Sequence, residues 1–543
     1  MKKLETIQRR KLASAYGGFG SIIETKDNGS LLIDDYSTWP CFSQRQLRQN
    51  PPVEIDDPRL LSFLQSTYPN LERLYRIPSS PDDLNVYYAN EGDLRYTKLS
   101  RYFPTWFYCT KCREMHRLSE WENKWNNQFP RDNKFKKNYP ACSNCSTQQQ
   151  NGKIRRRPLE QIRFCMASMD SGDLADIPFE KLFDPNVIIG GDDTACDLST
   201  VNAPQNIALF YRTSASSDGL QSINIVSGNR HISMAQISRP FILDRLQARH
   251  KPKTAYKVIL RNGNNVYYPN VIRSLFIPAP ANNQIQPDQG IYDNQEYDFI
   301  IDPRGYNARG IKSANDFHSV RYDNLTAPFV RKLYAINRLK ENAVIPSYTR
   351  ISNVSHRWWS IQDDVVRDLE NPVSVVAKSI DYRQEHFLPV IESYGEGVFL
   401  DMDVQNIATN EREIFVHTFS HIVMKELEFQ CGYPLSSLKE KIDRRNDSEY
   451  GILIYTIGGS EGSCGGLVSL LPPDSAATEG GKLPVLINNA LERAKDCPND
   501  PICEEEGGHC FACVDIPEIS CCKWNEDLDR RIINRYNPYC NPV

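Results

Sequence analysis

Hydrophobic periodicity is clearest in the last third of the chain. In residues 411–431, apolar side chains recur every three or four positions, which predicts a long helix. Gly432 stands where a C-cap glycine belongs, and Pro434 cannot continue the helix. Ser437 and Glu440 have the spacing of a capping box, which predicts a short second helix.

Other segments follow the same two periodicities. YGILIYTI predicts a buried strand, and residues 483–496 predict a further helix. The spacing of Leu333, Ile336, Leu339 and Val344 predicts a helix over residues 329–344. Near the N-terminus, GSIIETKDNGSLLID predicts a hairpin with an Asn-Gly turn, and DPRLLSFLQSTYPNLERLY has helical spacing.

These elements indicate a mixed α/β (α+β) fold in several domains, since 543 residues exceed the size of a single core. We expect an N-terminal α+β domain, a zinc-ribbon-like module, a β-rich middle domain, a helical or connecting region and a C-terminal zinc-stabilised α/β domain. The expected boundaries are 1–100, 101–160, 161–300, 301–400 and 401–543. The proline-rich run at 278–290 is typical of an exposed linker.

Charge and hydropathy narrow the class of protein. The formal net charge of −4 argues against a surface coated with basic residues for non-specific nucleic-acid binding. No run of about twenty apolar residues predicts a membrane span, and the basic N-terminus lacks the apolar stretch of a signal peptide. We therefore expect a cytoplasmic protein with reduced thiols.

The cysteine spacing predicts metal binding. Cys109, Cys112, Cys142 and Cys145 form two C-x2-C pairs separated by twenty-nine residues. Two thiolates on one tight turn can both reach a tetrahedral zinc ion at about 2.3 Å. Four sulfurs leave no open coordination position, so we expect this site to be structural.

A second cluster, CPNDPICEEEGGHCFACVDIPEISCC, predicts a second structural zinc ion. Cys510 and Cys513 are the firmest candidate ligands, followed by Cys503 and Cys521, with Cys497 as the main competitor. His509, Cys522 and Cys540 are weaker candidates. The segment is too short and too polar to bury a core, so a bound ion would supply its cross-link.

Three other features admit a functional or a structural interpretation. His417 and His421 lie four residues apart on one helical face, as metal ligands on helices do, but their apolar neighbours favour packed core histidines. The glycine-rich run 458–466 and its Cys464 are better interpreted as a tight turn than as a phosphate loop or a nucleophile site.

Enzymatic motifs are absent from the sequence. We find no Walker motif, phosphodiesterase motif, nucleophile elbow or dinucleotide fingerprint, and NPY at 537–539 is an incomplete methyltransferase tetrad. The one group of carboxylates that suggests a metal-dependent nuclease is Asp401, Asp403 and Glu411.

Several motifs together resemble the DrmB family of the bacterial anti-phage system DISARM. They are YGGFGSIIETKDNGSLLID, AINRLKENAVIPSYTRIS, ESYGEGVFLDM, HTFSHIVMKEL, GYPLSSLKEKI, GILIYT with EGSCGGL, and DPIC, CFAC and PEISC in that order. The last part also resembles a cysteine-bearing domain of unknown function found at the end of some bacterial helicases. One departure is MASMDSGDLADIPF, where Ser168 and Asp173 replace an expected cysteine and histidine.

The resemblance implies a non-catalytic, zinc-binding component that joins a DrmA-like helicase partner and engages DNA through that complex. A metal-dependent nuclease and a stand-alone DNA-binding protein are the alternative functions. A stand-alone binder would bind DNA by itself with a steep dependence on salt.

Overall fold

The computed structural model describes most of residues 17–77, 100–277, 295–350, 387–457 and 466–540, with short gaps in the first two ranges, and the strands between 359 and 379. The expected linker at 278–290 and the glycine-rich residues 458–465, including Cys464, lie outside the described residues. The chain forms two compact units whose segments interleave: Met1–Val53, Ile77–Val271 and Ile345–Asp381 make unit 1, and Glu54–Arg76, Ile272–Val344 and Tyr382–Val543 make unit 2. The sequence analysis expected five domains that follow one another along the chain, whereas each compact unit of the structure combines three separate segments.

Unit 1 is mostly β-structure. Among its described residues, the three larger sheets have the strand orders β1-β2-β4, β15-β14-β13-β6-β5-β9 and β11-β10-β17-β16-β12. The strands are β1 (Ile22–Glu24), β2 (Ser30–Ile33), β4 (Ser100–Tyr102), β5 (Trp106–Tyr108), β6 (Glu114–Arg117), β9 (Glu160–Gln161), β10 (Phe164–Ser168), β11 (Leu174–Ala175), β12 (Cys196–Asp197), β13 (Leu209–Thr213), β14 (Ile223–Ser227), β15 (Arg230–Ser233), β16 (Phe241–Asp244) and β17 (Lys253–Leu260).

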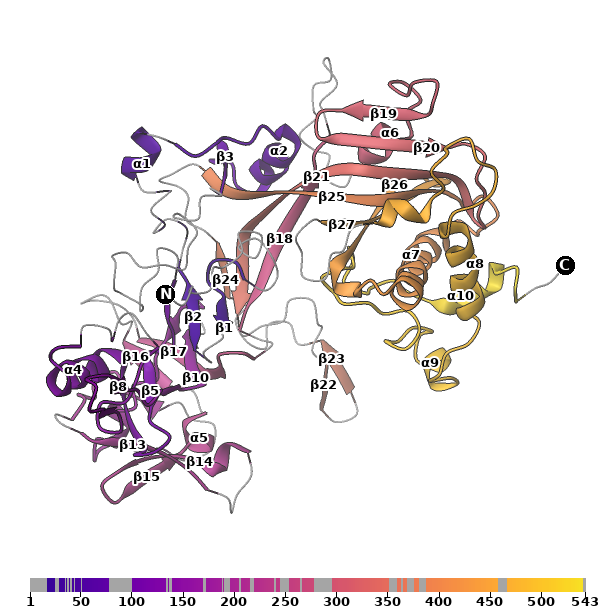
Figure 1. The fold of residues 1–543 in the computed structure, drawn as a ribbon. Helices are drawn as coiled ribbons and strands as arrows, with labels where there is room; N and C mark the ends of the chain where they lie inside the picture. The colour runs from indigo at the N-terminus through magenta and orange to yellow at the C-terminus, as the bar shows by residue number, and fades with distance from the viewer. Residues whose placement is uncertain are drawn as a thin grey trace. The chain divides into compact units, whose positions relative to one another are not determined.

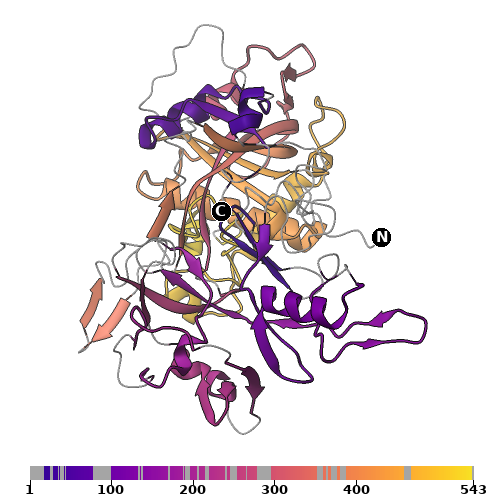
Figure 2. The same cartoon turned by 90° about the vertical axis from the view of Figure 1, so that its left-hand side faces the viewer.

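Short elements complete unit 1. They are the helices α1 (Gln44–Gln49), α4 (Leu118–Gln128) and α5 (Met234–Ile237), the 3-10 turns Lys181–Phe183 and Gly219–Ser222, the pair β7 (Thr147–Gln148) and β8 (Ile154–Arg155), the pair β22 (Trp359–Gln362) and β23 (Val365–Asp368), and β24 (Val376–Ser379). The N-terminal hairpin is confirmed, because Ile22 pairs with Leu32 in an antiparallel register. Figure 2 shows α4 and the strands around it in violet.

Unit 2 is built on one large sheet with the strand order β19-β20-β21-β25-β27-β26. Further pairs join β18 to β21 and, in parallel, β3 to β25. The strands are β3 (Arg73–Arg76), β18 (Tyr268–Leu275), β19 (Ile311–Ala314), β20 (Phe317–Tyr322), β21 (Val330–Arg350), β25 (Phe387–Asp403), β26 (Leu438–Asn446) and β27 (Glu449–Ile457). The chain of β18 begins, and that of β21 ends, in residues assigned to unit 1. The helical elements are α2 (Pro58–Thr67), α6 (Gln295–Ile301), α7 (Arg412–Cys431), the turns Leu435–Ser437 and Leu467–Leu470, α8 (Leu483–Arg493), α9 (Ile502–Glu505) and α10 (Arg530–Tyr536).

The sheet of unit 2 is buried on both faces. Ile452 and Ile454 of β27 belong to the core that contains α7, α8 and α10. Their neighbours Leu453 and Tyr455 belong to a second core with α6. Successive side chains of a strand point to opposite faces, so each face of the sheet has its own apolar layer. Figure 1 shows α7, α8 and α10 grouped together on one side of this sheet.

The expected helix over 329–344 is wrong, because this segment is the strand β21. Leu333 packs in the core with α7, whereas Ile336 and Leu339 both lie in the core with α6. A register irregularity between Ile336 and Leu339 lets side chains three residues apart share a face. When a strand is buried on both faces and has such a bulge, its apolar residues recur at intervals that are also typical of a helix.

The expected second helix after Gly432 is also wrong. Leu435–Ser437 forms only a 3-10 turn, and Glu440 lies within strand β26. The helix before it is confirmed as α7, and Gly432 ends it in the left-handed conformation with φ 72°. Strand β27 and helix α8 are confirmed as well. The expected fold class, a mixed α/β protein with a zinc-ribbon-like module and a C-terminal α/β domain, is thereby confirmed.

Candidate metal centres

The first cysteine group is assembled by a hairpin and a separate turn in unit 1. Cys109 directly follows β5, and Cys112 lies in the turn before β6. The turn is closed by hydrogen bonds from Cys109 N to Glu114 O and from Arg113 N to Cys109 O, at 3.0 and 2.8 Å. The amide of Lys111 also donates to Cys109 Sγ at 3.4 Å, which aims the sulfur into the turn.

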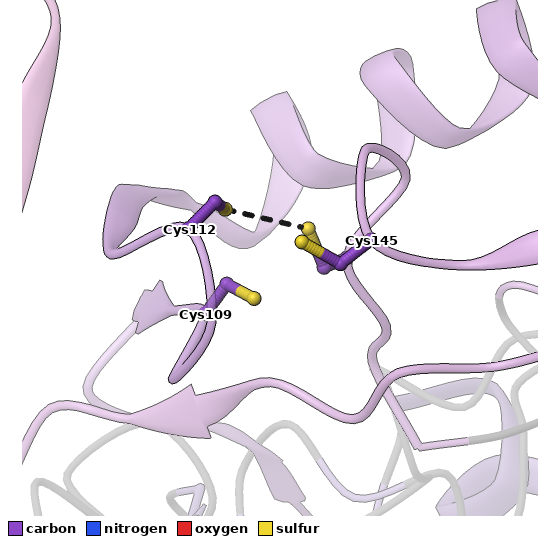
Figure 3. A group of neighbouring side chains, drawn as sticks. Cys109, Cys112 and Cys145 are labelled. Atoms are coloured by element: carbon purple, nitrogen blue, oxygen red, sulfur yellow. Dashed lines mark hydrogen bonds between the residues drawn. The ribbon is translucent and has the colours of Figure 1, made fainter.

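The second pair of this group comes from the turn before β7. The four sulfur atoms lie within 4.8 Å of one another, and Cys112 Sγ is 3.8 Å from Cys142 Sγ. Figure 3 shows the side chains of Cys109, Cys112 and Cys145 directed toward one another. A tetrahedral ion with sulfur ligands at about 2.3 Å separates them by about 3.8 Å, whereas a disulfide needs about 2.05 Å. The four residues Cys109, Cys112, Cys142 and Cys145 therefore fit a zinc ion.

The protein environment favours thiols over thiolates at Cys112 and Cys142. Burial is the main cause that raises the pKa of Cys112 to about 12, and it also raises the pKa of Cys142. Metal binding at this group therefore releases protons, and acid should oppose it. Trp121 and Trp125 of α4 pack in the same apolar cluster as Cys109 and Cys142, so the site is part of a core.

The second group lies in unit 2, between α8 and α10. Cys497, Cys503, Cys510 and Cys513 have their sulfur atoms within 4.8 Å of one another. The distances are 3.5 Å for Cys497–Cys510, 3.6 Å for Cys503–Cys513 and 3.7 Å for Cys510–Cys513. These separations match the edges of a tetrahedral four-sulfur site.

Hydrogen bonds prepare this group for a cation. Burial would raise the pKa of Cys510, but hydrogen bonds from the Ala512 amide, Cys497 and Asn499 outweigh it and lower the pKa to about 7. Burial raises the pKa of Cys503 to about 11. The surrounding loop is fixed by Arg530, whose guanidinium contacts both oxygens of Asp500 at 2.8 Å.

Cys521 does not join the other C-terminal cysteines. Cys497, which the sequence placed as its competitor, completes the four-sulfur group instead. Cys521 belongs to a third group with His417, His421 and Glu440, all buried. Its assignment to the same ion as Cys510 and Cys513 is thus corrected. The reason is that Val514 to Ser520 carries the chain away from the four-sulfur group to the side of α7.

Sequence spacing could not reveal the role of Glu440. Its side chain lies on β26 and contacts both histidines and Ser420. Burial would raise the pKa of Glu440, but the two imidazoles hold it well below its usual range. The signal that could have found it is the alternation of β26, which places a carboxylate among inward-facing apolar residues.

The remaining candidates lie outside these groups. His509 contacts Asp515 at 2.8 Å. Cys522 and Cys540 belong to no such group among the described residues.

The three carboxylates that suggested a nuclease are separated. Asp401 Oδ1 accepts hydrogen bonds from Arg331 at 2.7 Å and from Tyr297 at 2.9 Å. Glu411 pairs with Arg535 and accepts a hydrogen bond from Tyr536. Within the described part of the chain, these side chains and Asp403 form no group that could hold a metal ion.

Two family models match this chain. Residues 8–268 match a domain of unknown function (DUF8724), and residues 419–514 match the MrfA Zn-binding domain. The first match contains the N-terminal cysteine group and the second contains Cys497, Cys503, Cys510 and Cys513. Cys497, Cys503, Cys510 and Cys513 would hold the zinc ion that the second description names, because their sulfur atoms have suitable separations.

A curated relative and a solved structure are also similar. The DISARM protein DrmB of Bacillus paralicheniformis is 29% identical over 263 residues, which are 39% of this chain and 43% of the relative. The chain thus matches less than half the length of that relative. The crystal structure of the DUF1998 helicase MrfA bound to DNA superposes over 62% of this chain and 34% of that one, with 10% identity and a TM-score of 0.22. A TM-score this low supports no structural argument.

Every helix among the described residues is too short or too polar to cross a membrane. The sequence motifs, the curated relative and the zinc-domain match agree on one relationship. The chain is similar to the DISARM protein DrmB over 263 residues, and residues 419–514 match the MrfA Zn-binding domain.

Proposed function

We propose that this protein is a non-catalytic, zinc-stabilised component of a DISARM-type anti-phage complex. In this proposal it binds a DrmA-like helicase and engages DNA through that partner in the cytoplasm. The observation that carries the proposal is the similarity to the DISARM protein DrmB. The match to the MrfA Zn-binding domain supports it, because that domain takes its name from a helicase.

The two four-cysteine groups favour a structural role. Each offers four sulfur atoms to one ion, so a bound zinc ion would have no open position for water or substrate. The residues around each group form turns and a packed core. A rigid protein surface for a partner is the function that such sites support best.

The nuclease alternative has weaker support. Asp401 is engaged by Arg331 and Tyr297, and Glu411 by Arg535 and Tyr536. A catalytic Mg²⁺ would have to displace those contacts. A stand-alone DNA binder is also disfavoured by the net charge of −4, because phosphate contacts need basic residues.

The experiment is co-purification of the full chain with the products of its neighbouring genes, followed by DNA binding at two salt concentrations. The chain alone, the helicase alone and their mixture are compared. We expect a stable complex with the helicase, DNA binding by the complex, and neither ATP hydrolysis nor DNA cleavage by the chain alone. Salt-sensitive DNA binding by the chain alone, with no helicase complex, would establish the stand-alone alternative instead.

A further inference from the structure

Four buried side chains in unit 2 converge on one point in the described part of the chain. His417 and His421 lie one turn apart on α7, Glu440 lies on β26, and Cys521 lies in the loop after the four-cysteine group. The exposed fractions are 0%, 0%, 5% and 7%. A ligand atom of each lies within 4.8 Å of the ligand atoms of the others.

The distances are those of a coordination sphere. His417 Nε2 is 3.2 Å from Glu440 Oε1 and 3.2 Å from Cys521 Sγ. His421 Nε2 is also 3.2 Å from Glu440 Oε1. A tetrahedral zinc ion with bonds of about 2.0 Å to nitrogen and oxygen and 2.3 Å to sulfur separates nitrogen from oxygen by about 3.3 Å and nitrogen from sulfur by about 3.5 Å.

The hydrogen bonds of His421 leave room for a cation between its ring and Glu440. His421 Nδ1 lies 3.1 Å from the carbonyl oxygen of Val514, which can only accept, so Nδ1 carries the hydrogen. A neutral His421 therefore directs the lone pair of Nε2 at Glu440 Oε1, which is itself an acceptor when ionised. Two acceptors at 3.2 Å need a positive charge between them, either a proton or a metal ion.

The surrounding groups are arranged as they are around metal ligands. Cys521 Sγ accepts hydrogen bonds from the amides of Lys523 and Asn525, both at 3.2 Å, as a thiolate does. Glu440 accepts from Ser420 and from the amide of Cys522, which fixes its carboxylate. The Val514 carbonyl fixes the ring of His421. Such outer hydrogen bonds orient ligands and select the imidazole tautomer.

We propose that His417, His421, Glu440 and Cys521 bind a third metal ion, a divalent transition metal of which zinc fits the ligand set best. Two imidazoles, one carboxylate and one thiolate suit zinc, and four protein ligands in a buried site leave no position for a substrate. The ion would join α7, β26 and the loop that follows the four-cysteine group. Binding would displace the thiol proton of Cys521 to solvent.

This site extends beyond the zinc domain that the family comparison identifies. The matched residues, 419–514, include all four cysteines of the neighbouring group but neither His417 nor Cys521. The third ion therefore does not follow from that match.

The test is the metal content and ligand set of the full-length protein, purified in buffer containing Zn²⁺ without chelator. Elemental analysis should give three zinc ions per chain, because three groups are present. X-ray absorption at the zinc edge should give an average of three sulfur ligands and one nitrogen or oxygen ligand per ion. Two ions per chain with purely sulfur ligation would overturn the proposal in favour of a shared proton.

A matched pair of variants locates the ion. Cys521→Ser should lower the zinc content by one ion and restore purely sulfur ligation. Cys431→Ser, the same change at the end of α7 in a residue outside every candidate group, should keep three ions. Retention of three ions and of nitrogen or oxygen ligation in Cys521→Ser would contradict the assignment. Should Cys521→Ser fail to fold, the absorption spectrum of the wild-type protein decides alone.

Discussion

In the interior of unit 2, Nε2 of His421 lies 3.2 Å from Oε1 of Glu440, and both side chains are buried. The contact joins helix α7 to strand β26, two elements that a single turn separates in the sequence. It lies beside the loop that carries the C-terminal four-cysteine group, because the carbonyl oxygen of Val514 accepts the hydrogen on Nδ1 of His421. The position of α7 and the order of that loop are therefore coupled.

Loss of the C-terminal four-sulfur group should have a local effect. Replacing Cys510 and Cys513 by serine should remove one zinc ion and destabilise the surrounding loop, since a bound structural zinc ion contributes on the order of 10 kcal/mol to folding. Limited proteolysis should cut near residues 497–522 in the variant and spare them in the wild-type protein. Unchanged zinc content with unchanged proteolysis would show that these cysteines are not ligands.

The N-terminal group should behave independently. Replacing Cys112 and Cys145 by serine should also remove one ion, but proteolysis should then begin near α4, because Trp121 and Trp125 pack against this group. The C-terminal region should stay protected, since it has its own four sulfur ligands. Simultaneous loss of metal from both groups in either double variant would contradict this independence.

Gly432 should be costly to replace although there is room for a side chain. Its φ of 72° is in the left-handed region, and a Cβ atom there would meet nothing within 4 Å. Gly432→Ala should therefore lower the free energy of unfolding by about 1 kcal/mol through backbone strain alone. Urea unfolding measures the change, and Glu428→Ala on the exposed end of the same helix is the control, with an effect within about 0.5 kcal/mol. Equal stability of the two variants would refute the strain argument.

Asp443 on β26 should make stability depend on pH. Burial, with a further contribution from Glu296, raises the pKa of Asp443 to about 6, although Lys441 and Arg59 oppose the shift. The folded state thus holds a proton that the unfolded state has released, so stability falls as pH rises from about 4 to 6. Asp443→Asn should be more stable than the wild-type protein above pH 6, by up to about 3 kcal/mol, and the difference should vanish below about pH 4.

Chemical unfolding of both proteins at several pH values measures this difference in stability. The contributions of the other titrating groups are nearly the same in the two proteins, so they largely cancel in the difference. A variant that is less stable than the wild-type protein at pH 7.5 would show that the contact between Asp443 and Lys441, at 3.7 Å, outweighs the burial of the carboxylate.

Local sequence signals predicted the elements whose partners lie close in the chain. The hairpin of β1 and β2, helix α7 with its Gly432 cap, and the three C-x2-C turns follow from short-range spacing. Strand β21 was mistaken for a helix because it is buried on both faces and has a bulge. The side chains of such a strand alternate between two apolar layers, so neither face is polar. The sequence then lacks the apolar–polar alternation by which a strand is usually recognised.

For the candidate sites too, the sequence revealed the groupings of residues that are close in the chain and missed those that depend on the tertiary fold. Cysteines that share a turn could be paired from their spacing, but the membership of Cys497 and Cys521 depends on how the loop folds back. Glu440 looked like the end of a capping box because Ser437 precedes it by three residues. Only the tertiary structure brings it to His417 and His421.

The central claim is that the zinc-stabilised C-terminal domain gives this protein a rigid surface for a helicase partner. Lys425 of α7 donates to the carbonyl oxygens of Phe511 and Asp515, so the cysteine loop is fastened to the helix. The most direct test is a quantitative pull-down of the helicase by the wild-type chain, by Cys510→Ser/Cys513→Ser and by the control Cys431→Ser. We expect binding to the control as strong as to the wild type, and a loss of at least tenfold in affinity for the double variant. A double variant that lacks one zinc ion and still binds the helicase with wild-type affinity would contradict the account.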